Sequence, residues 1–378
     1  MQQNNKKTSK LLRIVEFQPI KLVLHHIHII NYIKQRSNMN NIKKIGLTAL
    51  AGSLAVTSAN AVEYSLSGDA IIKMTSRDNP AGTEANNGKG IGVDTDLYFN
   101  ASGELDNGFT VAFFQAADTN GAWSNSSSQV TVGMGSMGTL QINNIAGAKA
   151  NGIDDVMPFA YEETWDATDG KVHRADFFGS STASGSVDYR IPTQEMMGLT
   201  INASLTVDPN ADVGATTAGS PGASTVSGTA YTLQLGHESG VSVGFGVENI
   251  ENGNAVSATS TGADEESATG YIKYAMGPLT VGYQESYQNT ANGGEDKEGE
   301  MMGISYSAGD VSVSYGESTY SNAGVSDTAS VATDMDSIQI AYTVGAMTIS
   351  AATFETSNAA GIAGRTFEEN EIAVSFAF

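Results

Sequence analysis

The residues best suited to chemistry in this chain are carboxylates that gather in one long polar stretch, residues 143–183. The stretch separates two short runs with the alternation of β-strands, residues 139–143 and 184–191, and it is too long for an ordinary hairpin connection. Clustered carboxylates attract cations. We therefore take as candidate site residues the acids of this stretch, which are Asp154, Asp155, Glu162, Glu163, Asp166 and Asp169.

The charge of the whole chain points in the same direction. The formal net charge is −22, but the first 61 residues hold nine of the 19 Lys and Arg residues and only one of the 41 acids. From Val62 onward there remain 10 basic and 40 acidic residues. Nucleic acid is excluded as a partner of this part because phosphate binding needs clustered Lys and Arg. Cations are the expected counterparts.

Metal and cofactor motifs are incomplete. The chain has no cysteine, which excludes a disulfide framework and a thiolate metal site. The runs 166–170 and 334–336 resemble the start of calcium loops but lack the twelve-residue pattern. We expect no resident cofactor and at most adventitious Ca²⁺, and the metal ligands, if any, stay unknown.

Enzyme motifs are equally weak. Residues 133–138 fit G-x-G-x-x-G, but no βαβ unit follows, so a hairpin turn is favoured over a nucleotide site. After residue 61 the only histidines are His173 and His237, and no nucleophile-elbow pattern accompanies them. The chain is therefore not expected to be an enzyme.

The N-terminal 61 residues have the composition of targeting sequence. Residues 39–61 combine a basic start, a short apolar segment and a small-x-small site at Ala59 to Ala61, which is typical of a secretory signal peptide. Residues 1–38, with His25, His26 and His28, do not resemble the rest. We interpret them as a mis-assigned leader, with translation beginning at Met39, and expect the mature domain to span 62–378.

From Val62 onward, apolar and polar residues alternate with period two, which predicts strands with two different faces. No apolar run is long enough for a transmembrane helix. The pattern predicts sixteen strands, at residues 62–75, 91–105, 108–118, 128–134, 138–143, 184–191, 198–208, 228–237, 240–250, 267–276, 278–288, 300–308, 310–319, 336–344, 346–356 and 367–378.

The connections between these strands alternate strictly between short and long. The short ones are 106–107, 135–137, 194–196, 238–239, 277, 309 and 345; the long ones are 76–90, 119–127, 144–183, 209–227, 251–266, 289–299, 320–335 and 357–366. In an up-and-down sheet all short turns then lie at one end. Because hydrocarbon demands that every backbone group be paired, the pattern predicts an all-β, transmembrane antiparallel up-and-down β-barrel.

At this point the chain resembles the Gram-negative outer-membrane porins, particularly the alpha-proteobacterial, trimeric, sixteen-stranded general-diffusion type. The resemblance rests on residues 62–69, 103–109 and 138–142, on Gly147-Ala148 and on the terminal Phe378. It implies that the third long loop, 144–183, folds inward and forms a constriction from the acids named above. It also implies that Phe376 and Phe378 belong to a signal for the outer-membrane assembly machinery.

The resemblance further implies basic residues on the wall opposite the acidic loop. Strand parity directs Lys73, Arg190 and Lys273 inward, and Arg174 lies where the loop rejoins the wall. This basic set is thin, which favours cations. Trp165, Tyr161 and Phe159 could instead form an apolar slide for sugars.

The expected function is a water-filled channel for passive diffusion of small hydrophilic solutes and ions, embedded in lipid of the cell outer membrane of a Gram-negative bacterium as a homotrimer. A substrate-selective porin and a secreted β-rich adhesin or surface protein are the alternatives.

Overall fold

The computed structural model describes residues 62–78, 88–119, 123–144, 147–165, 175, 177–179, 185–209, 226–252, 264–289, 296–322 and 331–378. The expected leader and signal peptide lie outside these ranges. So do His173 and the candidate residues Asp166, Asp169 and Arg174.

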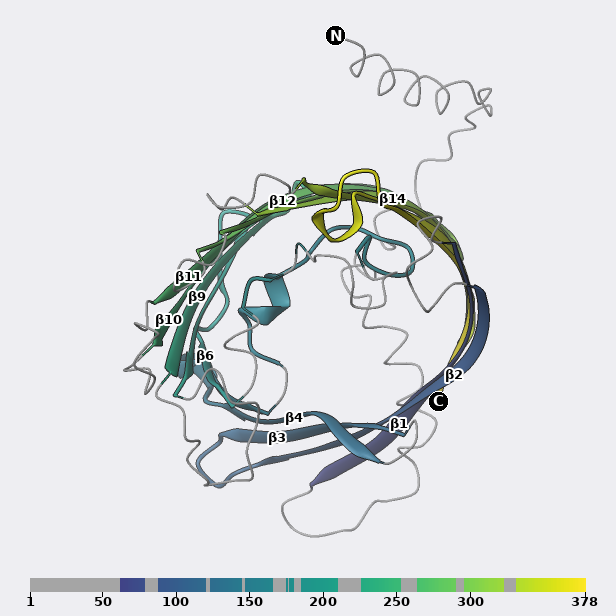
Figure 1. Cartoon of the computed structure of the whole chain (residues 1–378). Helices are drawn as coiled ribbons and strands as arrows, with labels where there is room; N and C mark the ends of the chain where they lie inside the picture. Colours follow the sequence, from purple (N-terminus) through teal and green to yellow (C-terminus); the bar gives the residue numbers. More distant parts are fainter. Residues whose placement is uncertain are drawn as a thin grey trace. The chain divides into compact units, whose positions relative to one another are not determined.

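The described residues form one antiparallel sheet that curves into a ring (Figure 1). Its strands are β1 (Glu63–Asp78), β2 (Gly88–Glu104), β3 (Thr110–Asp118), β4 (Ser124–Gly133), β5 (Thr139–Asn144), β6 (Val187–Arg190), β7 (Gln194–Met196), β8 (Leu199–Asp208), β9 (Val226–His237), β10 (Val241–Asn252), β11 (Glu265–Met276), β12 (Leu279–Asn289), β13 (Lys297–Ala308), β14 (Val311–Asn322), β15 (Thr333–Val344), β16 (Met347–Ser357) and β17 (Thr366–Ala377). Short 3-10 helices lie at η1 (Gly135–Met137), η2 (Asn151–Ile153) and η4 (Ala359–Gly361).

Strands β6 and β7 occupy a single position in the barrel, since both pair with β8. Pro192 has no N–H to donate, and the ladder changes register across it: Arg190 lies opposite Ser204, but Gln194 lies opposite Ile201. The predicted sixteen-strand barrel is therefore confirmed. The predicted turn at 194–196 is wrong, because the chain continues as β7 and turns at Met197 and Gly198, whose φ angles are 53° and 78°.

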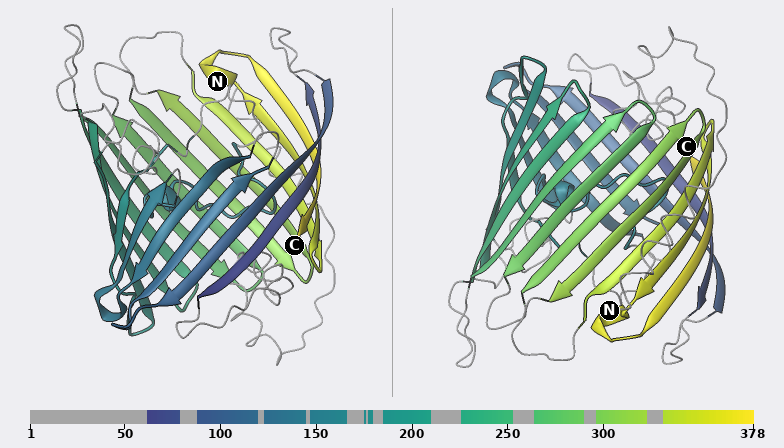
Figure 2. Two further views of the ribbon diagram at one scale, coloured as in Figure 1. Left: turned by 90° about the horizontal axis from the view of Figure 1, so that it is seen from below. Right: turned by 90° about the horizontal axis from the view of Figure 1, so that it is seen from above.

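Closure joins the first strand to the last. β1 pairs with β2 on one side and with β17 on the other, in a register that runs from Asp69 opposite Ala377 to Asp78 opposite Glu368. The final residue completes the seam: the Phe378 N–H donates to the Gly68 oxygen at 2.9 Å, and the Gly68 N–H donates to the Phe378 oxygen at 3.2 Å. The tilted strands thus leave no open edge (Figure 2).

The two faces of the sheet have opposite polarity. Apolar side chains such as Phe245, Ile338 and Ile372 are more than half exposed on the outside. Polar side chains such as Gln284 and Thr206 are fully buried on the inside. This inverted pattern suits a barrel whose outer surface meets lipid and whose interior holds water.

Outward-facing carboxylates form a row near the long-loop ends of β12 to β17. Each lies directly opposite another in the ladder, as Glu285 opposite Glu300, Glu317 opposite Asp336, and Glu355 opposite Glu368. Tyr315 donates its hydroxyl to Glu317 at 2.5 Å. Because carboxylates avoid hydrocarbon, this row marks one boundary of the lipid-facing band. No helix within the described ranges has the length and apolar character needed to cross a membrane.

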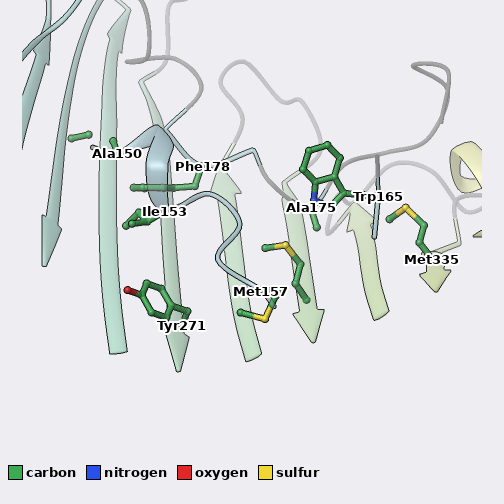
Figure 3. Close-up of a cluster of buried hydrophobic side chains, with 10 residues drawn as sticks. Ala150, Ile153, Met157, Trp165, Ala175, Phe178, Tyr271 and Met335 are labelled. Carbon is green, nitrogen blue, oxygen red and sulfur yellow. The ribbon is translucent and has the colours of Figure 1, made fainter. Parts of the chain in front are cut away.

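The hydrophobic core lies inside the ring, between the wall and an inner segment that we define as residues 147–165, 175 and 177–179. Figure 3 shows Ile153, Met157 and Trp165 of this segment with Tyr271 of β11 and Met335 of β15. Phe178 and Ile153 are buried to 0% and 1% exposure. Burial of these side chains attaches the segment to the interior of the barrel.

Glycines on the wall make room for the segment. A Cβ atom built on Gly303 of β13 would lie 2.8 Å from the Pro158 Cδ and 2.9 Å from the Pro158 oxygen. A Cβ atom on Gly282 of β12 would lie 3.0 Å from the Met157 sulfur. Gly246 and Gly316 are similarly covered, by Phe178 and Thr164 respectively. At these glycines the inner segment therefore packs directly against the backbone of the wall strands.

The closing hydrogen bonds should stabilise the barrel measurably. Deleting Phe378 removes both bonds with Gly68, whereas Phe378→Ala retains them. We expect the deletion to lower the free energy of unfolding in detergent by about 1–3 kcal/mol, and Phe378→Ala to lower it less. Urea titration followed by the heat-dependent gel shift of the barrel measures both. Equal losses would assign the effect to the aromatic side chain.

Filling the space at Gly303 should disturb the inner segment. Gly303→Ala places a methyl group against the Pro158 backbone, at an expected cost of about 1–3 kcal/mol in unfolding free energy. Gly236→Ala in β9 is the matched control, because a Cβ atom there meets nothing within 4 Å. Urea unfolding of both variants tests this. A control as unstable as Gly303→Ala would show that loss of strand glycines, not contact with the segment, is responsible.

Candidate functional site

The inner segment runs along the inside of the wall from β10 to β15 (Figure 1). Its backbone donates to inward-facing polar side chains: Val156 N–H to Gln284 at 3.1 Å, and Ala160 N–H to the Ser314 hydroxyl at 2.8 Å. Described residues of the 144–183 loop thus follow the inward course expected of it. The segment narrows the interior from one side.

Two of the candidate acids shape the segment itself. Asp154 accepts the Asp155 N–H at 2.9 Å and the Asn151 side-chain amide at 3.1 Å. Asp155 accepts the Met157 N–H at 2.8 Å and the Trp165 indole N–H at 3.0 Å. Their carboxylates satisfy backbone donors in a turn, so part of their role is structural.

Glu162 lies at the other end of the segment, beside the closing seam. The Lys73 Nζ of β1 contacts Glu162 at 2.6 Å and Glu371 of β17 at 3.0 Å. The Tyr161 hydroxyl donates to Glu371 at 3.3 Å, and the Lys73 ammonium lies 5.5 Å from the Tyr161 ring centroid. Burial, reinforced by Glu162 and Glu371, raises the pKa of Tyr161, so its phenol remains a donor. Glu163, the next residue, is half-buried.

The described basic candidates all contact the inner segment. Lys73 binds Glu162, the Lys273 Nζ donates to the Val156 oxygen at 3.0 Å, and the Arg190 Nη2 donates to the Gly147 oxygen at 3.1 Å. Arg190 also pairs with Asp188 at 2.6 Å. These cations therefore hold the segment at three points along its length. They do not form a basic cluster on the opposite wall, across the lumen from the acids of the segment.

The sequence interpretation missed a set of aspartates on the opposite wall. Asp69 of β1 lies opposite Asp96 of β2, which lies opposite Asp118 of β3. Asp94 shares the inward face of β2, and the Tyr98 hydroxyl donates to Asp69 at 2.7 Å. We call Asp69, Asp94, Asp96 and Asp118 the aspartate wall. The period-two pattern of 91–105 already directs Asp94 and Asp96 inward, but only the register brings the four together.

Other inward carboxylates were also missed. Glu369 of β17 is fully buried and pairs with Arg77 at 2.9 Å. On the described strands, inward-facing acids outnumber inward-facing basic side chains. The acids include Asp69, Asp94, Asp96, Asp118, Asp188, Asp208, Glu248, Glu265, Glu369 and Glu371, against Lys73, Arg77, Arg190, Lys273 and Lys297.

Several other residues that the sequence analysis considered for binding or catalysis lie in turns, in buried clusters or on the outer face of the barrel. Trp165, which belongs to the segment, is 8% exposed and lies in the same buried cluster as Met335 of the wall, so most of its ring is hidden from the lumen. Residues 133–138 form the β4–β5 hairpin with η1, and His237 contacts Ser239 in a turn. Asp334 and Asp336 face outward on β15. Within the described ranges no three His, Cys, Asp or Glu residues are grouped to hold a metal ion.

Comparison with known proteins agrees with this architecture. The Gram-negative porin family model matches residues 46–377. Among solved structures, an anion-selective porin from Comamonas acidovorans has a TM-score of 0.59 at 12% identity, covering 84% of this chain and 100% of that one. An outer membrane protein of Vibrio cholerae lacking its loop L8 has a TM-score of 0.57 at 13% identity, with 85% and 100% coverage.

A Rh. blastica porin variant has a TM-score of 0.52 at 15% identity, covering 83% of this chain and 100% of that one. The comparison with curated proteins found no match. These likenesses to solved structures support the fold, and the family model extends over nearly all of the region from the end of the signal-like segment onward. The chain therefore belongs to the Gram-negative porin family, whose members are non-enzymatic channels of the outer membrane.

Proposed function

We propose that the channel admits small hydrophilic solutes by passive diffusion and prefers cations. The observation that carries this proposal is the excess of carboxylates on the inward face, with the aspartate wall on β1 to β3 and the acids of the inner segment elsewhere. Fields from charges beside a narrow passage act more strongly on an ion than in bulk water. Cations are favoured and anions are repelled on both sides.

The inner segment is the proposed constriction. Its acids Asp154, Asp155, Glu162 and Glu163 remain candidate constriction residues, and Lys73, Arg190 and Lys273 become residues that hold the segment while offsetting part of its charge. For Asp166, Asp169 and Arg174 the proposal rests on the sequence alone. The anion-selective porin from Comamonas acidovorans has a similar fold, but a preference for anions does not suit an interior with this charge.

We also propose a homotrimer of the alpha-proteobacterial general-diffusion kind, exported by the signal peptide at 39–61, with residues 1–38 as a mis-assigned leader. An outward aromatic cluster supports contact between copies on the β1–β3 side: the Tyr64 and Phe113 ring centroids each lie 6.0 Å from that of Phe99.

The apolar Phe376 and exposed Phe378 end the chain and suit recognition by the assembly machinery. The closed barrel and the family exclude the adhesin alternative.

Single-channel recording in a planar bilayer under a KCl gradient tests the proposal. We expect conductance steps that occur in groups of three, one step for each barrel of a trimer. We also expect a reversal potential with the sign that corresponds to K⁺ permeating more readily than Cl⁻. A reversal potential of the opposite sign would keep the channel and reject cation preference. Saturable block by one solute would favour the substrate-selective alternative.

The aspartate wall should carry a measurable share of the selectivity. We expect Asp69→Asn, Asp94→Asn, Asp96→Asn and Asp118→Asn combined to shift the reversal potential toward zero, because four lumen charges are removed. The matched control changes four outward acids by the same total charge: Glu285→Gln, Glu300→Gln, Glu317→Gln and Glu355→Gln. At about 0.1 M salt, charges beyond roughly 10 Å are screened, so the control should leave the potential unchanged. Equal shifts would assign selectivity to overall charge.

A further inference from the structure

Among the side chains of the wall that the structure describes, two glutamines bind the backbone of the inner segment through both the oxygen and the nitrogen of the amide. Gln284 of β12 and Gln339 of β15 are 0% and 2% exposed. Both point inward from the middle of long strands, and both use the oxygen and the nitrogen of the side-chain amide. Each contacts the main chain of the segment.

Gln284 holds the segment directly after η2. Its Nε2 donates to the Ile153 oxygen at 2.9 Å and to the Asp154 oxygen at 2.8 Å. Its Oε1 accepts the Val156 N–H at 3.1 Å, and Nε2 also lies 2.8 Å from the Thr269 hydroxyl, so its two N–H groups are shared among three acceptors. The irregular backbone at 153–156 has no partner strand, and the Gln284 amide supplies hydrogen-bond partners in its place. It contacts three backbone groups of the segment, which are the Ile153 and Asp154 oxygens and the Val156 N–H.

Gln339 makes the same kind of contact further along. Its Oε1 accepts the Tyr161 N–H at 2.9 Å and the Glu162 N–H at 3.1 Å, and its Nε2 donates to the Glu162 oxygen. Ser314 lies opposite Gln339 in the ladder and accepts the preceding Ala160 N–H. The backbone at 160–162 is thus bound at consecutive residues.

The other described contacts bind the segment differently, because Lys273 and Arg190 each donate one hydrogen bond to its backbone and accept none. The Lys73–Glu162 ion pair is partly exposed, with the Lys73 side chain at 35%, and solvent weakens such pairs. Apolar burial attaches the segment but is non-directional, so it does not fix where the backbone lies. A buried amide with both donor and acceptor engaged fixes position and orientation.

We propose that Gln284 and Gln339 are positioning residues that set the place of the inner segment, and with it the width of the passage. The effect on the width of the passage rests on the proposed channel function, whereas the role of the two glutamines in placing the segment does not. Loss of two to three hydrogen bonds to the segment, each worth a factor of about five, should raise the population of detached segment by roughly 25- to 100-fold.

The experiment exploits the absence of cysteine from the chain. Gly152→Cys carries a nitroxide label, since a Cβ atom there meets nothing within 4 Å and the residue lies beside the Gln284 contact. In the full barrel, electron paramagnetic resonance should report increased label mobility with Gln284→Ala. Single-channel traces of Gln284→Ala and of Gln339→Ala should show a changed mean conductance and larger current fluctuations.

Gln288→Ala is the matched control. Gln288 is a buried inward glutamine of the same strand, but its described partners are Glu265 and Lys297 of the wall. We expect wild-type label mobility and conductance from it. Gln284→Met and Gln339→Met serve if either alanine variant fails to fold: each nearly keeps the side-chain volume and loses the hydrogen bonds to the segment, so the same effect as for alanine is expected.

The outcomes separate this inference from the proposed function. Unchanged label mobility and conductance in folded Gln284 variants would overturn the positioning role, as would an equal effect of Gln288→Ala. Wild-type barrels without conductance would reject the proposed function, yet increased label mobility in Gln284→Ala would still support the positioning of the segment.

Discussion

The requirement that no backbone N–H or C=O remain unpaired in hydrocarbon governs this molecule. It forces the sheet to close, and here closure extends to the last residue, where Phe378 exchanges two hydrogen bonds with Gly68. Closure in turn separates a lipid-facing surface from an enclosed interior. The apolar exterior and polar interior follow from that separation, as does the absence of a conventional core between sheet faces.

A related requirement applies to the inner segment, which has little regular structure and whose backbone groups are buried against the wall and must also be paired. Its backbone groups are satisfied by side chains of the wall, such as Gln284 and Ser314. Glycines at Gly282 and Gly303 allow the approach that these bonds require. The wall is therefore specialised on β10 to β15 for holding a chain that crosses its interior.

Period-two patterning was sufficient to predict the architecture, because each face of a strand meets a uniform environment. It failed at 194–196, where Pro192 interrupts the ladder without ending the strand. Parity correctly separated inward from outward residues, but it carries no information on register. It could not indicate that Asp69, Asp96 and Asp118 are cross-strand neighbours, nor that Lys73 meets Glu162 across 89 positions of sequence.

For the candidate site the limits were greater. The acids of the long loop were visible from composition, but their division between shaping turns and facing the lumen depends on backbone conformation that no local pattern encodes. Gln284 and Gln339 gave no signal, since a polar residue at an inward position of a barrel strand is unremarkable. Their role arises only from the folded segment above them.

Because these glutamines bind main-chain atoms, the inner segment is attached at those points without reference to its side-chain identities. Different parts of the chain therefore hold the segment and line the passage. The wall supplies many of the side chains that hold the segment, and the segment supplies side chains that line the passage. Substitutions among lumen-facing residues of the segment can alter the solutes that pass while the segment keeps its place. A barrel built in this way allows its permeability to diversify, in evolution or by design, without loss of its internal framework.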